Sequence, residues 1–257
     1  MMKTVRIREQ WGNGRAAMNS WLTLPSALTA EMVAQQGFDA LTIDMQHGAI
    51  GYETALSMLQ AIATTPATPL VRIPWLAPDM AMKMLDAGAW GIICPMINTP
   101  EEVEALVRYC HYPPAGERSF GPLRAETCYG ADYPVLANDY VLPIAMIETR
   151  EALANLDRIL QVPGLGGVYI GPYDLSYALG CQPAPDTYEQ PVLDAIGHIL
   201  ARAQHYNVPA GMHCLSAEYA VAMAQKGFQL VTAGSDSGWL QQGVQAAQCL
   251  LRKAGLA

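Results

Sequence analysis

The feature that most constrains this chain is a repeated pair of an apolar run with the length of a buried strand and a following helical pattern. Eight such pairs are joined by mostly short links, and no break in composition divides them. The expected strands cover residues 19–24, 38–43, 69–74, 90–97, 141–147, 167–171, 209–213 and 230–234. This alternation, in a chain of 257 residues, predicts an α/β fold of the (β/α)8 TIM-barrel type. We expect one domain over residues 1–257.

Helix boundaries support the pattern. Thr99-Pro-Glu-Glu102 has the form of a capping box with Pro at the first helical position, and it predicts a helix start. Thr149 is expected to cap the helix after the fifth strand, and Asp174 a short helix after the sixth. From about 111 to 139 no period is visible, so we expect a long loop that is functional or makes subunit contacts. The last helix should run to about Arg252.

The composition limits the binding partners and the cellular location that we expect. Lys and Arg total 15 against 23 Asp and Glu, a formal charge of −8, and no basic cluster interrupts the acidic balance. We therefore expect no nucleic acid and no anionic membrane as partners. The polar start and the lack of a long apolar run predict a cytoplasmic protein. The six scattered cysteines, without a C-x-x-C pair, are expected to be reduced.

Several of the expected strands end in polar residues. The second strand leads into Asp44, Gln46 and His47, within Leu41-Thr-Ile-Asp-Met-Gln-His-Gly48. In a barrel the carboxyl ends of all strands meet on one face, where active sites are found. The residues expected there are Trp21, Asp44, Gln46, His47, Arg72, Glu148, Asp174 and Asp236.

Glu148 and Asp174 follow adjacent strands and could give two oxygen ligands to a divalent ion of the Mg²⁺ type. They could equally complement a helix dipole and cap a helix. Arg72 and His47 on the same rim favour the metal.

Arg72 itself fits either a salt bridge or a charge that stabilises an oxyanion. His47 fits either a buried, hydrogen-bonded histidine or, as we favour, a base oriented by Asp44.

The positions of the lysines limit the chemistry. Lys3, Lys83, Lys226 and Lys253 all lie away from strand ends, so a Schiff base in the barrel mouth is not supported. Any carbonyl activation would have to come from a metal acting as a Lewis acid. Asp236, in the middle of the loop after the eighth strand, would repel a phosphate dianion and weakly favours a substrate without phosphate.

The sequence resembles the HpcH/HpaI family of metal-dependent pyruvate aldolases over about Trp21 to Asp236. The matching segments include Gly37-Phe-Asp-Ala-Leu-Thr-Ile-Asp-Met-Gln-His-Gly48, Val71-Arg-Ile-Pro74, Gly91-Ile-Ile-Cys-Pro-Met96, Gly116-Glu-Arg-Ser-Phe-Gly-Pro122, Met146-Ile-Glu-Thr149 and Val168-Tyr-Ile-Gly-Pro-Tyr-Asp-Leu-Ser176. They occur in the family's order.

The resemblance implies a class II aldolase that adds pyruvate or hydroxypyruvate to an aldehyde and uses Mg²⁺, Mn²⁺ or Co²⁺. Glu148 and Asp174 would bind the metal, and Arg72 would stabilise the enolate oxygen. Backbone amides near Tyr173 and Asp174 would hold the carboxylate of the 2-oxoacid, and Trp21 either packs over the substrate or fills the barrel.

For the proton transfer, the resemblance implies His47 as base, acting through a metal-bound water and supported by Asp44 and by Asp86 of a neighbouring subunit. It also implies a homo-oligomer, a hexamer built as a dimer of trimers, in which the last helix packs on a neighbouring subunit.

One position departs from the family. Many relatives have Glu where this chain has Gln46, and an amide cannot relay a proton, so Gln46 is expected at most to donate a hydrogen bond to metal-bound water in the substrate-binding site. Oxaloacetate decarboxylation, a citrate lyase β-like reaction on a coenzyme A thioester and a non-catalytic acid-binding barrel stay open as alternatives.

Overall fold

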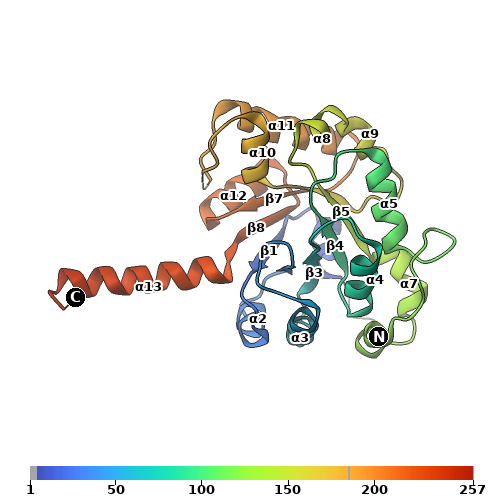
Figure 1. The fold of residues 1–257 in the computed structure, drawn as a ribbon, viewed down its shortest axis with the longest axis horizontal. Helices are drawn as coiled ribbons and strands as arrows, with labels where there is room; N and C mark the ends of the chain where they lie inside the picture. Colours follow the sequence, from blue (N-terminus) through green and yellow to red (C-terminus); the bar gives the residue numbers. More distant parts are fainter. Residues whose placement is uncertain (1–4, 185, 257) are drawn as a thin grey trace.

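The computed structural model describes residues 5–184 and 186–256, and it contains a closed barrel of parallel strands in sequence order (Figure 1). The strands are β1 (Ala17–Leu22), β2 (Ala40–Asp44), β3 (Thr68–Arg72), β4 (Gly91–Cys94), β5 (Leu142–Met146), β6 (Gly167–Ile170), β7 (Ala210–Cys214) and β8 (Leu230–Ser235). β1 pairs with both β2 and β8, which closes the sheet. The predicted (β/α)8 fold is confirmed.

Helices pack around the barrel and connect the strands. They are α1 (Arg6–Gly12), α2 (Ala27–Ala34), α3 (Tyr52–Ile62), α4 (Pro78–Asp86), α5 (Pro100–Cys110), α6 (Leu123–Tyr129), α7 (Tyr133–Tyr140), α8 (Arg150–Ala154), α9 (Leu156–Leu160), α10 (Pro172–Leu179), α11 (Gln190–His205), α12 (Ala217–Lys226) and α13 (Asp236–Lys253). The capping box at Thr99 is present with both of its hydrogen bonds, and Thr149 caps α8 by accepting from the amide of Ala152.

Three local expectations differ from the structure. The segment 111–139 contains α6 and most of α7, because its Pro and Gly residues separate two helices too short to show a period. The helix after Thr149 is divided at Asn155 into α8 and α9. Asp174 does not cap α10: the cap position is Gly171, with Pro172 as the first helical residue, and Asp174 lies in the first turn.

Two apolar layers hold the barrel together. The larger lies between the strands and the surrounding helices, while a smaller cluster fills the barrel interior and includes Ile7, Leu70 and Tyr169. α1 brings the buried Ile7 to this inner cluster. All six cysteines are free, as predicted.

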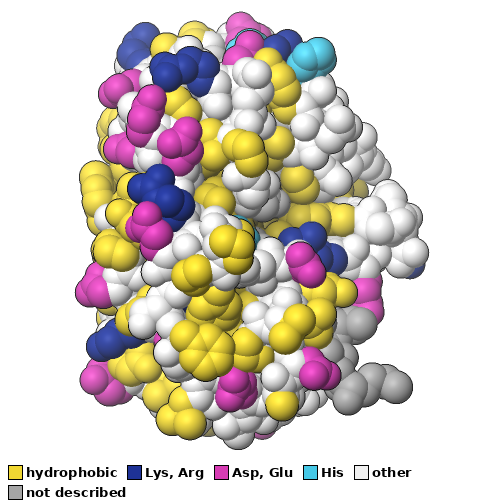
Figure 2. Space-filling view, turned by 90° about the vertical axis from the view of Figure 1, so that its right-hand side faces the viewer, with side chains coloured by type: hydrophobic (Ala, Val, Ile, Leu, Met, Phe, Trp, Pro, Cys, Tyr) yellow, Lys and Arg dark blue, Asp and Glu magenta, His cyan; other side chains and the backbone are white. Residues whose placement is uncertain are grey.

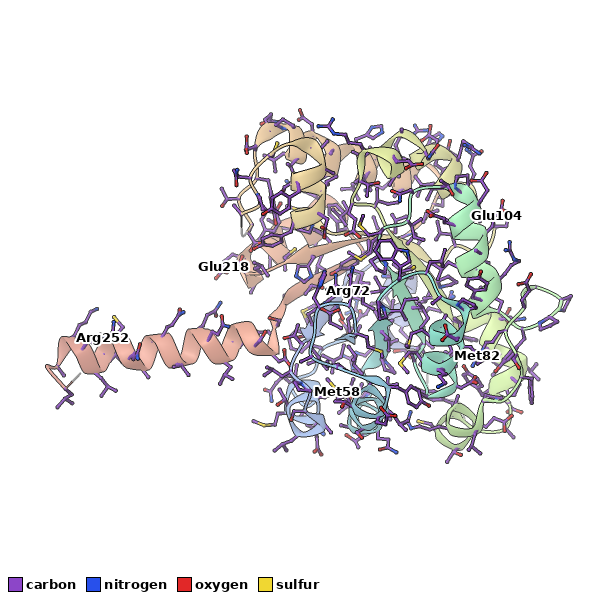
Figure 3. The ribbon with its side chains drawn as sticks, in the orientation of Figure 1. Met58, Arg72, Met82, Glu104, Glu218 and Arg252 are labelled. Carbon is purple, nitrogen blue, oxygen red and sulfur yellow. The ribbon has the colours of Figure 1, made fainter. Side chains whose placement is uncertain are left out.

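The last helix is the exception to this packing. Figure 1 shows α13 leaving the barrel between α12 and α2 and projecting away from it, and Figure 3 shows its side chains on all sides free of the barrel, with Arg252 far from the strands. Every residue from 239 to 256 is exposed. Among the described residues, no helix combines the length and the apolar character needed to cross a bilayer.

Asp236 closes the barrel where β8 meets β1. Its buried carboxylate accepts hydrogen bonds from the amide of Thr23 at 2.9 Å, the Thr23 hydroxyl at 3.0 Å and the amide of Leu24 at 3.1 Å. It also accepts from the amide of Ser237 at 2.8 Å. The carboxylate is therefore used within the fold.

We expect Asp236→Ala to lower the free energy of unfolding by about 2–4 kcal/mol, because it leaves buried amides without an acceptor. Chemical denaturation at a fixed protein concentration measures this. Asp132→Ala is the matched control: Asp132 is exposed and makes no capping hydrogen bond, so a change within about 0.5 kcal/mol is expected. Equal losses in the two variants would contradict the role of Asp236.

Candidate active site

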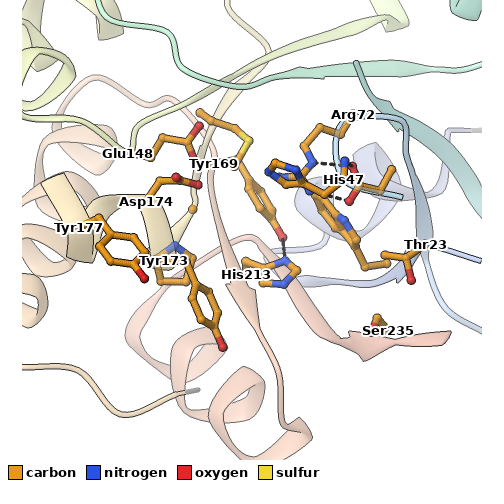
Figure 4. Close-up of a pocket in the computed structure, with 15 residues that line it drawn as sticks. Thr23, His47, Arg72, Glu148, Tyr169, Tyr173, Asp174, Tyr177, His213 and Ser235 are labelled. Atoms are coloured by element: carbon orange, nitrogen blue, oxygen red, sulfur yellow. Dashed lines mark hydrogen bonds and ion pairs between the residues drawn. The ribbon is translucent and has the colours of Figure 1, made fainter. Parts of the chain in front are cut away.

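A cavity of about 380 Å³ opens at the carboxyl end of the barrel (Figure 4). Side chains from β1, β2, β3, β5, β6, β7 and β8 or from the turns after them line it. They are Trp21, Thr23, Asp44, His47, Arg72, Met146, Glu148, Tyr169, Gly171, Pro172, Tyr173, Asp174, Tyr177, His213 and Ser235. Seven of the residues predicted from the sequence are among them: Trp21, Asp44, His47, Arg72, Glu148, Tyr173 and Asp174.

Glu148 is a buried carboxylate that is only half satisfied. Its Oε1 accepts a hydrogen bond from the amide of Met96 at 2.8 Å, whereas Oε2, in the described part of the chain, has no partner. A side chain at Gly171 would collide with Oε2, so glycine at that position leaves room for the carboxylate. Burial, followed by the nearby charge of Asp174, raises the pKa of Glu148 to about 7.

Asp174 lies beside Glu148 in the cavity (Figure 4), and its charge acts on Glu148. Across the described residues, no group of three or more His, Cys, Asp or Glu side chains is arranged to hold a metal. The pair therefore fits a hard cation that takes its other ligands from water and substrate oxygens, as Mg²⁺ does. The unpartnered Oε2 is the observation in favour of this fit, because a buried anion needs a compensating charge.

Arg72 and Asp44 form a two-point ion pair on the other side of the cavity. Their positions face each other across β2 and β3. Nε donates to Oδ1 at 2.8 Å and Nη2 to Oδ2 at 2.6 Å. The guanidinium also lies over the Trp21 ring, 5.0 Å from its centroid. Although burial acts to raise it, the pKa of Asp44 is lowered, because Arg72 bonds to the carboxylate and attracts it.

His47 stands at the cavity with an exposed side chain. Asp44 accepts hydrogen bonds from the main-chain amides of Gln46 at 3.0 Å and His47 at 3.2 Å, so the carboxylate shapes the turn. Within the described residues, no hydrogen bond joins the His47 ring to Asp44. Contrary to the expectation from the sequence, Asp44 therefore does not orient the His47 imidazole. Its carboxylate orients Arg72 and positions the backbone of His47.

Three other predicted residues lie outside the cavity lining. Gln46 turns its Oε1 into a buried position where it finds no partner in the described structure. Asp86, at the end of α4, accepts a hydrogen bond from buried Arg118 at 2.6 Å. Asp236 is held by Thr23 and Leu24, as described above.

Part of the cavity wall was not predicted from the sequence. Thr23, Met146, Tyr169, Tyr177, His213 and Ser235 also line the cavity. His213 was given no role from the sequence. The signal that could have found it is its place at the end of the seventh strand, one residue before the strand stops.

The cavity mouth therefore contains the carboxylate pair of Glu148 and Asp174, which suits a cation, and the fixed guanidinium of Arg72 opposite this pair. The exposed imidazole of His47 lies at the edge of the same cavity. These groups can hold a small acid and stabilise negative charge on one of its oxygens. The fold and the site are those of a (β/α)8-barrel enzyme.

Comparison with known proteins identifies the family. Residues 18–242 match the model of the HpcH/HpaI aldolase/citrate lyase family. The hydroxypyruvate/pyruvate aldolase of Rhizorhabdus wittichii is 46% identical over 91% of this chain and 94% of its own length. The 4-hydroxy-2-oxo-heptane-1,7-dioate aldolase of Klebsiella pneumoniae is 37% identical over 91% and 88%.

Among solved structures, an HpcH/HpaI aldolase/citrate lyase family protein from Burkholderia cenocepacia superposes with a TM-score of 0.89 at 29% identity, covering 97% of this chain and 99% of that one. The chain belongs to the HpcH/HpaI aldolase/citrate lyase family. It is an enzyme of the aldolase or lyase type, and the alternatives of a coenzyme A thioester lyase and a non-catalytic barrel are not favoured.

The raised pKa of Glu148 predicts a pH-dependent penalty in the metal-free protein. The folded state holds the proton more tightly than the unfolded state, so this group destabilises the fold increasingly as pH rises from about 4.5 to about 7. The full penalty at pH 8 is roughly 3 kcal/mol.

Glu148→Gln removes this penalty. Denaturation in chelator should therefore show the variant gaining stability relative to the parent by up to about 3 kcal/mol between pH 4.5 and pH 8. Glu151→Gln, on the exposed surface of α8, serves as the control. A stability difference between Glu148→Gln and parent that is independent of pH would show that Glu148 titrates normally.

Proposed function

We propose that this protein catalyses the reversible aldol addition of pyruvate or hydroxypyruvate to an aldehyde, giving 4-hydroxy-2-oxoacids. The observation that carries the proposal is the unpartnered buried oxygen of Glu148 beside Asp174, in the same cavity as Arg72. The names of the relatives from Rhizorhabdus wittichii and Klebsiella pneumoniae support this donor and product class.

The proposed cofactor is a divalent ion, Mg²⁺, Mn²⁺ or Co²⁺, held by Glu148 and Asp174. When bound, it acts as a Lewis acid that polarises the keto group of the 2-oxoacid. No lysine is found among the described residues that line the cavity, so the chain offers no amine there for Schiff-base chemistry.

The chain's own residues supply the other roles. Amides of the first turn of α10, at Tyr173 and Asp174, point out of a helix N-terminus and bind the carboxylate of the 2-oxoacid. Arg72, fixed by Asp44 and Trp21, donates to the keto oxygen and stabilises the negative charge that develops on it. Trp21 is buried beneath the guanidinium and so positions Arg72.

His47 takes the proton from C3 of the 2-oxoacid, and the electron pair left behind forms the enolate. C3 then bonds to the aldehyde carbon, and the aldehyde oxygen receives a proton to become the 4-hydroxyl group. The same enolate would form if oxaloacetate lost carbon dioxide, so decarboxylation is an expected side activity. Gln46, turned away from the cavity lining, has no proton-transfer role in this scheme.

Proton exchange at the pyruvate methyl group tests the donor half of the reaction. In heavy water with Mg²⁺, Mn²⁺ or Co²⁺, NMR recorded after the metal is chelated should show loss of the methyl proton signal with the parent enzyme. Glu148→Gln and Asp174→Asn should abolish it, and Arg72→Lys should slow it about 10²–10³-fold, because the two-point geometry is lost.

The control for this experiment is Glu218→Gln, an exposed residue on α12 far from the cavity. It should exchange at the parent rate. Parent enzyme that leaves the methyl signal unchanged with every one of the three metals would overturn the proposed function.

We also propose a homo-oligomer, a hexamer arranged as a dimer of trimers, in which α13 packs on a neighbouring subunit. Leu240, Val244, Ala247 and Leu251 fall on one stripe of α13, and all are exposed. On the barrel, Met18 of β1 and Met32 of α2 are also exposed, 50% and 62%. A stripe without a partner and an uncovered barrel flank, close to where α13 departs, suit an exchange between two copies.

A second face supports subunit contact. Figure 2 shows apolar side chains gathered between scattered charges on the side of the molecule that carries α4 and α7. Phe120, Leu123 and Val135, in the segment 111–139, are 68%, 84% and 80% exposed. Asp86, the last residue of α4, is paired with Arg118 of this segment, so we propose that Asp86 approaches the His47 of a neighbouring subunit there.

The free cysteines suit a reducing compartment, which supports a cytoplasmic location.

Charges on the stripe of α13 should break the assembly. We expect Leu240→Asp combined with Val244→Asp to lower the mass measured by sedimentation equilibrium, because a buried unpaired carboxylate is costly. Gln242→Asp with Gln245→Asp, on the opposite side of the helix, adds the same charge and should leave the mass unchanged. If both double variants keep the parent mass, α13 does not join subunits.

A further inference from the structure

The wall of the cavity away from the carboxylate pair carries hydroxyl groups and an imidazole. Figure 4 places Glu148 and Asp174 on one side and Thr23, His213 and Ser235 on another. The donor 2-oxoacid occupies the first side in the proposed function, so the second side is left for the aldehyde. None of Thr23, His213 and Ser235 has a role in forming the enolate.

His213 is held in place by aromatic rings and a hydrogen-bonded chain. Its ring meets Trp21 edge to face at 4.9 Å, and its Nδ1 lies 3.5 Å from the Tyr169 hydroxyl. That hydroxyl is fixed by Thr232 at 2.5 Å, and Thr232 accepts from Asn19 at 2.9 Å. With Nδ1 directed at Tyr169, Nε2 is the ring nitrogen left for a ligand.

The imidazole is neutral at working pH. Burial, together with the positive charge of Arg72, lowers the pKa of His213 to about 4. A neutral ring has one donor and one acceptor, so Nε2 either donates or accepts according to the direction of the Tyr169 hydrogen bond. A hydroxyl group suits both states, because it donates as well as accepts.

The charges of the cavity disfavour an anionic aldehyde. Arg72 is the one Arg or Lys among the described residues that line the cavity, and Asp44 already neutralises it. Asp236 binds the Thr23 hydroxyl directly and places a negative charge behind this wall. Ser235 accepts from the amide of Gly238, and its hydroxyl lies 3.4 Å from that of Ser237, a long contact from which its proton can turn to a ligand.

We propose that His213 and Ser235 form the acceptor side of the active site and select an uncharged aldehyde that carries hydroxyl groups. His213 is a specificity-determining residue that hydrogen-bonds a hydroxyl of the acceptor through Nε2, and Ser235 donates to a second one. This inference rests on the proposed aldolase function and names its acceptor class. An uncharged acceptor gives a product with one carboxylate, whereas an acceptor that carries its own carboxylate gives a product with two.

Three aldehydes of similar length test the proposal with the holoenzyme and pyruvate: glyceraldehyde, butanal and succinic semialdehyde. For the parent enzyme, kcat/KM should be highest with glyceraldehyde. His213→Leu should lower the glyceraldehyde-to-butanal ratio of kcat/KM about tenfold, the loss expected for one hydrogen bond. His213→Asn, which keeps a donor and an acceptor, should recover part of the ratio.

The ratio is taken on one preparation, so a loss of active protein does not change it. His205→Leu, at an exposed histidine at the end of α11, is the control and should keep the parent ratio. A ratio in His213→Leu within twofold of the parent, or a parent enzyme that prefers succinic semialdehyde, would overturn the inference. Absence of deuterium exchange into pyruvate would instead show that the proposed function itself is wrong.

Discussion

The carboxylate of Glu148 is buried at the end of β5, and a protein group satisfies only one of its oxygens. A buried charge without compensation either takes up a proton or attracts a cation. Asp44 shows the contrasting case, because Arg72 meets both of its oxygens. The mouth of the barrel therefore contains one complete ion pair and one carboxylate, beside Asp174, that needs a positive partner. This unequal compensation gives the cavity a cation side and a fixed guanidinium side, and both the chemistry and the orientation of a bound acid depend on it.

Trp21 connects these electrostatics to the shape of the cavity. Its indole lies under Arg72, stacks on Tyr169 at 5.5 Å and meets the edge of His213. One ring from β1 thus fixes a group expected to act on the donor and a group expected to act on the acceptor. Below it, Asn19 donates a hydrogen bond to Thr232 and accepts one from Thr42 across the barrel interior. These polar side chains meet one another's hydrogen-bonding needs inside the barrel. The inner apolar cluster can therefore stay closely packed, and the Tyr169 side chain stays fixed.

The parts of this arrangement that could be predicted from the sequence are those that depend on local pattern. Strand positions, the capping box at Thr99 and the collection of Glu148, Asp174 and Arg72 at one mouth follow from periodicity and from the rule that parallel strands align their carboxyl ends. The pairing of Asp44 with Arg72 in preference to His47 depends on the register of β2 against β3, which no local pattern specifies. His213 was missed for a similar reason: the barrel turns its side chain inward, and one residue of shift would have turned it outward.

The exposure of α13 also follows from the way the barrel closes between β8 and β1. Asp236 joins the end of β8 to the segment that follows β1, through Thr23 and Leu24, and Ser235 caps the helix, so the direction of α13 is set at its first residue. From that point α13 does not fold back over β1. It continues outward, so its apolar stripe and the barrel flank around Met18 are both exposed to water. Exposed apolar surfaces of this kind are costly in water, and the proposed packing of α13 on a second copy would cover both of them. Asp236 lies in the first turn of α13 and Ser235 caps the helix, so the residues that begin α13 also hold Thr23 and form part of the cavity wall.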